Sequence, residues 1–163
     1  MTLAELNACD RDRFVATLGW IFERSPWVAE RAWVSRPFAS RDDLHRAMVE
    51  TLRSASRDEQ HDLLCAHPDL GTKARMSDAS VGEQAGAGLD RLTPEEFHRL
   101  THSTSAYRER FGFPFLLAVK GLTKHDVFTA LAERLPRNPD AEWQEALEQV
   151  GRIAAFRLRD VVD

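Results

Sequence analysis

The sequence predicts an all-α fold, a single-domain bundle of about seven to nine helices. Helix-start signals recur from one end of the chain to the other, whereas the alternating pattern of a half-buried strand is almost absent. The one extended candidate, residues 113–119, is an apolar run with no partner strand, so we expect a buried helix start or an irregular core segment there. No repeat or change of composition marks a second domain, and the 163 residues suit one domain over residues 1–163.

Four helix starts lie in the first part of the chain. Each begins with a side chain that can accept a hydrogen bond from the free N–H groups of a first turn. The expected caps are Asp10, Ser25 (before Pro26), Ser40 (with Asp43) and Ser56, where Glu59 completes a capping box. Two buried faces are expected from apolar residues at helical spacing: Phe14, Leu18 and Ile21, then Leu44, Met48 and Leu52.

Four more helix starts follow. Ser80 with Glu83 matches a capping box. A clearer one, Thr93-Pro94-Glu95-Glu96, opens a helix that should end near Phe111, because Gly112 follows. Thr123 with Asp126 opens a helix that Pro136 stops, and Asn138-Pro139 opens the last helix. The buried stripe expected on that helix is Leu147, Val150, Ala154, Leu158 and Val161.

A titratable side chain stands where the fourth helix must stop. Pro68 pushes His67 out of the helical region, so we expect His67 at or just past the helix end. The partial negative charge of a helix C-terminus favours imidazolium, and histidine already titrates near neutral pH. His67 is therefore a candidate proton donor or acceptor, although a lone histidine at such a place is more often a cap.

Two further segments depart from the plain helical pattern. Residues 80–84 combine a hydroxyl, a carboxylate and an amide; they form a helix cap, an anion-binding set beside free backbone N–H groups, or both. Residues 111–119 place three aromatics around Gly112 and Pro114. That pattern indicates either core packing at a helix corner or a pocket wall whose unpaired backbone groups bind a flat polar ligand.

Arg157 lies on the flank of the apolar stripe of the last helix. A guanidinium there must reach water, pair with an acid or bind an anion, and the sequence favours pairing and ligand binding equally.

No metal site is expected. His61 and Cys65 share a helix face, but no other residue completes a pattern of metal ligands. We expect a surface histidine and a small buried cysteine there. The other histidines expected at the surface are His45, His98, His102 and His125.

The bulk composition narrows the class of protein. With 43% hydrophobic and 29% charged residues, the chain resembles a soluble globular protein. A net charge of −4 argues against a nucleic-acid partner. Two cysteines give no disulfide framework, no apolar run is long enough for a membrane span, and no signal-peptide pattern is present, so we expect a cytoplasmic protein.

Several motifs together resemble the family of 2-oxo-4-hydroxy-4-carboxy-5-ureidoimidazoline (OHCU) decarboxylases. They follow the family's order and spacing over nearly the whole chain. The matching stretches are Phe22 to Val28, His67-Pro68-Asp69-Leu70-Gly71, Ser80 to Leu89 with Glu83-Gln84-Ala85-Gly86, Phe111-Gly112-Phe113-Pro114-Phe115, and Arg152 to Leu158. Two positions depart from the pattern: Thr104 stands where the family often has asparagine, and Lys120 where some members have arginine.

The resemblance implies a cofactor-free decarboxylase, usually a homodimer, that forms (S)-allantoin in the last step from urate. It implies His67 as the catalytic residue with Glu83 beside it, and no metal. The substrate-lining residues that it implies are Pro68, Ser80, Val81, Gly82, Glu83, Gln84, Phe115, Leu116, Leu117, Ala118, Val119 and Arg157. Two rival hypotheses are a hydrolase of a related ureide or hydantoin, which would normally need a metal or an activated nucleophile, and a non-enzymatic helical binding module.

Overall fold

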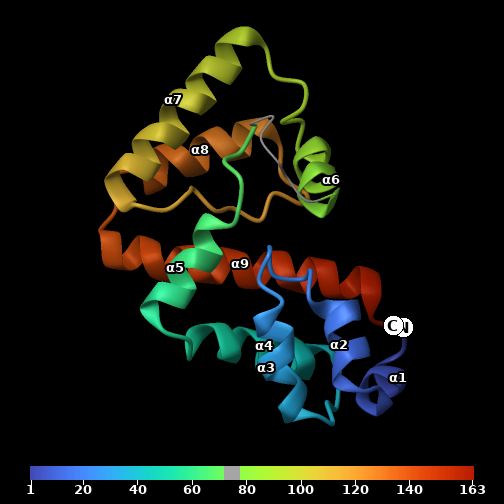
Figure 1. Ribbon diagram of the computed structural model, residues 1–163. Helices are drawn as coiled ribbons and strands as arrows, with labels where there is room; N and C mark the ends of the chain where they lie inside the picture. The colour runs from blue at the N-terminus through green and yellow to red at the C-terminus, as the bar shows by residue number, and fades with distance from the viewer. Residues whose placement is uncertain (72–77) are drawn as a thin grey trace. The chain divides into compact units, whose positions relative to one another are not determined.

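The computed structural model describes residues 1–71 and 78–163, and every regular element within these ranges is a helix (Figure 1). The predicted all-α class is therefore confirmed. The elements are α1 (Leu3–Ala8), α2 (Arg11–Leu18), α3 (Trp27–Ala32), the 3₁₀ helix η1 (Trp33–Ser35), α4 (Arg41–Arg53), α5 (Arg57–Cys65), α6 (Asp78–Gly86), α7 (Pro94–Phe111), α8 (Lys124–Arg134) and α9 (Pro139–Val161).

The chain packs as two compact units. The terminal unit comprises Met1–Ala66 and Val150–Asp163, and the central unit comprises His67–Gln149. Helix α9 contributes to both, with residues up to Gln149 in the central unit and the remainder in the terminal unit. The expectation of one domain over residues 1–163 stays a prediction.

The predicted helix starts are set by local hydrogen bonds. The side chains of Asp10, Ser40, Ser56, Thr93 and Thr123 each accept a hydrogen bond from the third residue of the helix that follows. Each such cap stabilises its helix by about 1 kcal/mol. The end of α7 is equally local, because Gly112 adopts φ +79°, a left-handed conformation that glycine reaches without a Cβ penalty.

Two of the predicted caps are wrong. Pro26, not Ser25, is the N-cap of α3, and the Ser25 hydroxyl donates to the Glu23 carbonyl at 2.9 Å. Helix α6 is already formed at Asp78, so Ser80 lies inside its first turn rather than capping it. Ser25 bonds to a carbonyl instead of capping, because a serine hydroxyl can bond to nearby backbone carbonyls as well as to helix N–H groups.

The apolar stripes are largely as predicted. In the terminal unit, the predicted α2 and α4 residues are buried, although Ile21 lies beyond the end of α2. At the end of α9, Val161 is only half-buried, so the predicted stripe is wrong at its last position; Val162, just past the helix, is fully buried. The central unit is built around an aromatic cluster of Tyr107, Phe113, Phe115 and Trp143.

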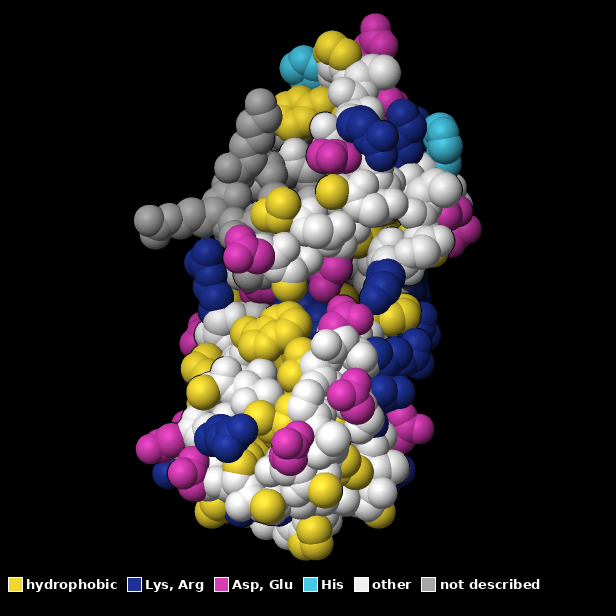
Figure 2. Space-filling view, turned by 90° about the vertical axis from the view of Figure 1, so that its right-hand side faces the viewer, with side chains coloured by type: hydrophobic (Ala, Val, Ile, Leu, Met, Phe, Trp, Pro, Cys, Tyr) yellow, Lys and Arg dark blue, Asp and Glu magenta, His cyan; other side chains and the backbone are white. Residues whose placement is uncertain are grey.

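Acidic and basic side chains lie beside each other on the face seen in Figure 2, as expected from the nearly balanced charge. In the described ranges, no helix has both the length and the apolar character needed to cross a membrane.

The two ends of the chain are bonded to each other within the terminal unit. The Met1 amino group donates to the Val161 carbonyl at 2.9 Å, and the Asp163 N–H donates to the Met1 carbonyl at 3.1 Å. The N and C labels of Figure 1 accordingly coincide.

Candidate functional site

His67 begins the central unit, directly after the last residues of α5. The capping box of Ser56 and Glu59 starts this helix, and Ala66 is its C-cap, so His67 stands just past the helix end as predicted. Its side chain is only 6% exposed. A buried imidazole beside the negative end of a helix dipole is a suitable place for a group that accepts and returns a proton.

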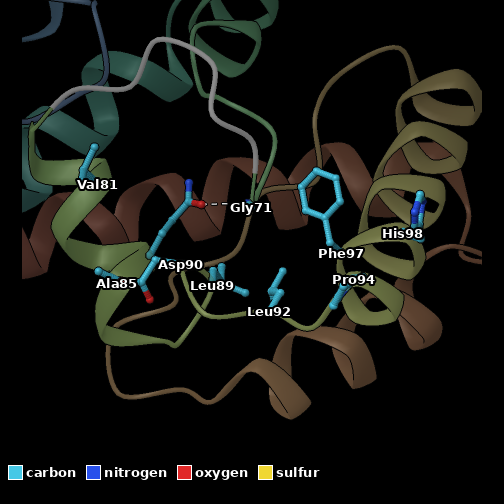
Figure 3. A pocket seen from close by; sticks show the side chains of 10 residues that line it. Gly71, Val81, Ala85, Leu89, Asp90, Leu92, Pro94, Phe97 and His98 are labelled. Carbon is cyan, nitrogen blue, oxygen red and sulfur yellow. Dashed lines mark hydrogen bonds between the residues drawn. The ribbon is translucent and has the colours of Figure 1, made fainter.

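The first two sequence motifs are joined by a hydrogen bond. The Gly71 N–H donates to Oε1 of the buried Gln84 at 2.8 Å, which Figure 3 shows as a dashed line. Gly71 has φ +74°, and a Cβ there would lie 2.6 Å from Cδ2 of Leu100. The tract from His67 to Gly71 is therefore bonded to α6 through a residue whose backbone conformation favours glycine.

Helix α6 orients the five predicted residues 80–84 differently. Ser80 and Gln84, one turn apart, are buried; Glu83 is half-buried. Val81 is 48% exposed and Gly82 is also exposed. Ser80 and Gln84 thus lie on the buried face of the helix, with Glu83 at its edge.

The segment after α7 is an irregular piece of core, as predicted. Phe113, Pro114, Phe115 and Leu116 are buried, and Leu117 and Ala118 are half-buried. The Phe115 ring meets the Tyr107 ring edge-on at 5.2 Å between centroids. Core packing, one of the two alternatives for this segment, is therefore present.

The second alternative, a wall of unpaired backbone groups, is wrong at three positions of residues 115–119. The Val119 carbonyl accepts a hydrogen bond from the Leu122 N–H at 2.9 Å. The Leu116 carbonyl accepts a hydrogen bond from Nη1 of Arg134 at 2.6 Å. The Ala118 N–H donates to Oε1 of Gln149 at 2.9 Å. Between them, the N–H and C=O of Leu117 have no hydrogen-bond partner in residues 1–71 and 78–163.

A buried ionic cluster that the sequence analysis did not find supports this segment. Glu142 is fully buried and accepts hydrogen bonds from Nε and Nη2 of Arg134 at 2.9–3.1 Å and from the Tyr107 hydroxyl at 2.6 Å. Burial, together with the bond to Glu142, raises the pKa of Tyr107 well above its usual range. The sequence contains one sign of this cluster. Two polar residues, Glu142 and Gln149, stand seven residues apart on the buried and otherwise apolar face of α9.

Arg157 pairs with an acid inside the terminal unit. Its side chain is almost fully buried, Nη2 donates to Oε2 of Glu23 at 3.0 Å, and Nη1 is 3.3 Å from the Ile21 carbonyl. The two stretches of the resemblance nearest the chain ends, around Glu23 and around Arg157, therefore meet. Of the predicted residues, Arg157 alone belongs to the terminal unit.

The other histidines and the cysteine differ in part from expectation. His45 is half-buried, and its Nε2 lies 2.7 Å from the Gly151 carbonyl, so its prediction as a surface residue is wrong. His98, His102 and His125 are exposed as predicted. Cys65 Sγ lies 3.5 Å from Nε2 of His61, and Cys65 is only half-buried. No group of three or more potential ligands for a metal occurs in the part of the chain that the structure describes.

A cavity of about 630 Å³ lies on one side of α6 (Figure 3). Its lining is mostly apolar: Gly71, Val81, Gln84, Ala85, Leu89, Asp90, Leu92, Pro94, Phe97 and His98. Only Val81 and Gln84 among these are predicted substrate residues. The cavity therefore adjoins the joined motifs without containing His67, Glu83 or residues 115–119.

Comparison with known proteins decides the family. A model of the family described as OHCU decarboxylase matches residues 7–159, which include every predicted site residue. The chain belongs to the OHCU decarboxylase family. The resemblance inferred from the motifs is thus confirmed, and with it the expected class of enzyme, a decarboxylase of urate degradation.

Relatives of this family include both short and longer proteins. The chain is 45% identical over 160 residues to the 2-oxo-4-hydroxy-4-carboxy-5-ureidoimidazoline decarboxylase of Haloferax volcanii, covering 98% of this chain and 95% of that protein. It is 48% identical over 161 residues to the uric acid degradation bifunctional protein PucL of Bacillus subtilis, covering 99% of this chain. The chain spans only 33% of the length of PucL.

Solved structures share the fold. A crystal structure of (S)-allantoin synthase superposes with a TM-score of 0.80 at 34% identity, covering 100% of this chain and 55% of that one. A crystal structure of OHCU decarboxylase in the presence of (S)-allantoin superposes with a TM-score of 0.71 at 18% identity, covering 93% of this chain and 97% of that one; it bears on the fold alone.

Proposed function

We propose that this chain decarboxylates OHCU to (S)-allantoin without a cofactor, with His67 as the group that moves the proton. The observation that carries the proposal is the family match over residues 7–159, together with the buried position of His67 at the end of α5. Relatives named for this reaction are 44% and 45% identical to nearly the whole chain.

The chemistry asks little of the protein beyond positioning and proton transfer. The substrate carries a hydroxyl and a carboxylate on a carbon next to a C=N bond. When CO₂ leaves, the electron pair of the broken C–C bond moves toward that C=N bond, so the substrate supplies its own electron sink. A proton must then be delivered to one face of the carbon atom of the former C=N bond to give a single enantiomer, while the hydroxyl loses its proton and becomes a carbonyl.

His67, in a pair with Glu83, would relay this proton between the hydroxyl or a ring nitrogen and the new C–H centre. General acid–base help of this kind contributes about 10²–10⁴-fold to a rate. The half-buried Glu83 and the buried Ser80 and Gln84 come from one short helix, which the bond between Gly71 and Gln84 ties to the His67 tract. That tie supports a common site for the first two motifs.

The remaining substrate contacts are proposed as follows. Leu117, which has an N–H and a C=O without partners in the described residues, offers one donor and one acceptor to the flat ureido-imidazoline. Pro68 and the residues around Leu117 would supply apolar walls. Arg157 would bind an oxygen-rich group of the substrate through its guanidinium. Its hydrogen bond to Glu23 already holds this guanidinium in one orientation.

The test is to add the purified chain to freshly generated OHCU and to follow the circular dichroism of the allantoin formed. The wild type should produce one enantiomer quickly, and His67→Asn should leave only the slow spontaneous, racemic reaction. His102→Asn, at an exposed histidine of α7, is the matched control and should behave as wild type. Wild-type turnover at the spontaneous rate would refute the proposed function; an active His67→Asn would refute the role of His67 alone.

We also expect a homodimer in the cytoplasm. Size-exclusion chromatography with light scattering tests the first, and a monomer at micromolar concentration would contradict it. Fractionation of the native cells tests the second, and recovery outside the cytoplasmic fraction would contradict it.

A further inference from the structure

We propose that Arg134 and Gln149 are positioning residues that direct the backbone N–H and C=O of Leu117 toward the substrate. The inference rests on the proposed function. Arg134 and Gln149 are two buried side chains that act as anchors for the segment around Leu117. Arg134 binds the carbonyl before Leu117, and Gln149 binds the amide after it.

The first anchor is the guanidinium of Arg134. Nη1 donates to the Leu116 carbonyl at 2.6 Å, while the same group lies 4.5 Å from the centroid of the Phe115 ring. Glu142 takes the opposite side of the guanidinium through two of its nitrogens, Nε and Nη2. A planar fork held on one edge by a buried carboxylate has its remaining donors fixed in direction, so the Leu116 carbonyl is held in one orientation.

The second anchor is the amide of Gln149, which is 4% exposed. Its Oε1 accepts from the Ala118 N–H at 2.9 Å, and its Nε2 donates to Oε1 of Glu145 at 2.8 Å. The bond to Glu145 determines which end of the amide faces Ala118, because only the oxygen can accept. Glu142, Glu145 and Gln149 lie at helical spacing on α9, so one face of this helix supports both anchors.

Planarity of the peptide bond carries the effect of each anchor to Leu117. In a trans peptide, the C=O of one residue and the N–H of the next lie in one plane and point in opposite directions. In residues 1–71 and 78–163 the cis bond is Arg36–Pro37, so both peptide bonds of Leu117 are trans. A Leu116 carbonyl held by Arg134 therefore turns the Leu117 N–H away from Arg134. An Ala118 N–H held by Gln149 likewise turns the Leu117 C=O away from Gln149.

The result is a fixed donor and a fixed acceptor on a single half-buried residue, neither of which has a partner in the described chain. This pair is complementary to a cyclic amide or ureide, which carries an N–H next to a C=O. A buried ion pair contributes little net stability compared with apolar residues, so the cost of burying Arg134 and Glu142 is explained by the orientation that they impose.

The experiment compares KM and kcat on OHCU for matched variants. Gln149→Met removes both hydrogen bonds at similar volume, and Arg134→Lys keeps the charge but loses the fork; each should raise KM about tenfold and change kcat much less. Gln144→Met, an exposed position on the same helix, and Arg137→Lys, which meets Glu142 but not the segment, are the controls and should keep the wild-type KM. In the exchange variant E145Q/Q149E, the new carboxylate at position 149 can accept from the Ala118 N–H, and the new amide at position 145 can donate to that carboxylate. Both hydrogen bonds are thereby restored, so KM should return most of the way to the wild-type value.

The outcomes separate the two proposals. If the wild type does not accelerate OHCU decarboxylation, the proposed function falls and this inference falls with it. If the wild type is active and folded Gln149→Met and Arg134→Lys keep the KM of their controls, only the inference is overturned. A measurement on the wild type needs no variant: the ¹H–¹⁵N resonance of Leu117 should shift on saturation with allantoin, and an unchanged resonance would overturn the inference even where the variants fail to fold.

Discussion

Replacing Glu142 by glutamine should strongly lower the free energy of unfolding. Its carboxylate is fully buried and is the acceptor for two nitrogens of Arg134 and for the Tyr107 hydroxyl. In Glu142→Gln the charge of Arg134 stays buried without a counter-ion, and the new NH₂ group faces other donors. Breaking one partner of a buried ion pair costs about 3–5 kcal/mol.

Urea unfolding at pH 7, followed by far-ultraviolet circular dichroism at one fixed protein concentration, measures this loss. Arg137→Gln is the control, because Arg137 approaches the same carboxylate at 3.5 Å but is 43% exposed; its loss should stay below about 1 kcal/mol. A loss below about 1 kcal/mol for Glu142→Gln would refute the reasoning, since it would mean that Arg134 is hydrated or finds another acceptor.

Three further outcomes are expected. Gly71→Ala should lower the free energy of unfolding by about 1–2 kcal/mol, because φ is +74° and the new Cβ would meet Leu100; an unchanged urea midpoint would contradict this. The pKa of Tyr107 is raised in the folded state, so its contribution to stability is complete below about pH 10 and is lost as the unfolded chain ionises above it. Tyr107→Phe should therefore make the free energy of unfolding fall less steeply with pH above about pH 10. A fall as steep as in the wild type would contradict this prediction. A hydrogen bond from Arg31, with a second from the Ser56 backbone, lowers the pKa of Glu59 to about 2, so its contribution is present above about pH 4.5 and is lost toward pH 2. Glu59→Gln should make the acid limb between these values shallower, and an unaltered limb would show that the pair is not maintained in solution.

Features set by neighbouring residues could be predicted from the sequence. Thr93 with Glu96 and the left-handed Gly112 define the two ends of α7, and each depends on contacts within one helical turn. The position of His67 followed from Pro68 for the same reason. Helix α1 was missed because its six residues are too few to show a period, although Thr2 and Glu5 form a capping box.

Features set by distant residues could not be predicted in this way. Arg157 could have reached water, an anion or an acid, and its choice depends on Glu23, which is 134 residues away in sequence. For residues 115–119 the sequence left core packing and a wall of unpaired backbone groups as alternatives, because Arg134 and Gln149, which bind two of these groups, lie 18 and 31 residues away. Burial of such polar side chains is a consequence of tertiary packing, and their partners become apparent only when the helices are in place.

The hydrogen bonds between Met1, Val161 and Asp163 make the connectivity of the chain nearly that of a closed ring. A domain or tag attached at either end would leave the terminal unit from the same spot. A few residues of linker between the two ends should allow circular permutation, with new ends opened at an exposed turn such as the one at Ser54, between α4 and α5. In protein engineering, a fusion at the N-terminus and a fusion at the C-terminus would therefore place the added domain at the same site on the terminal unit.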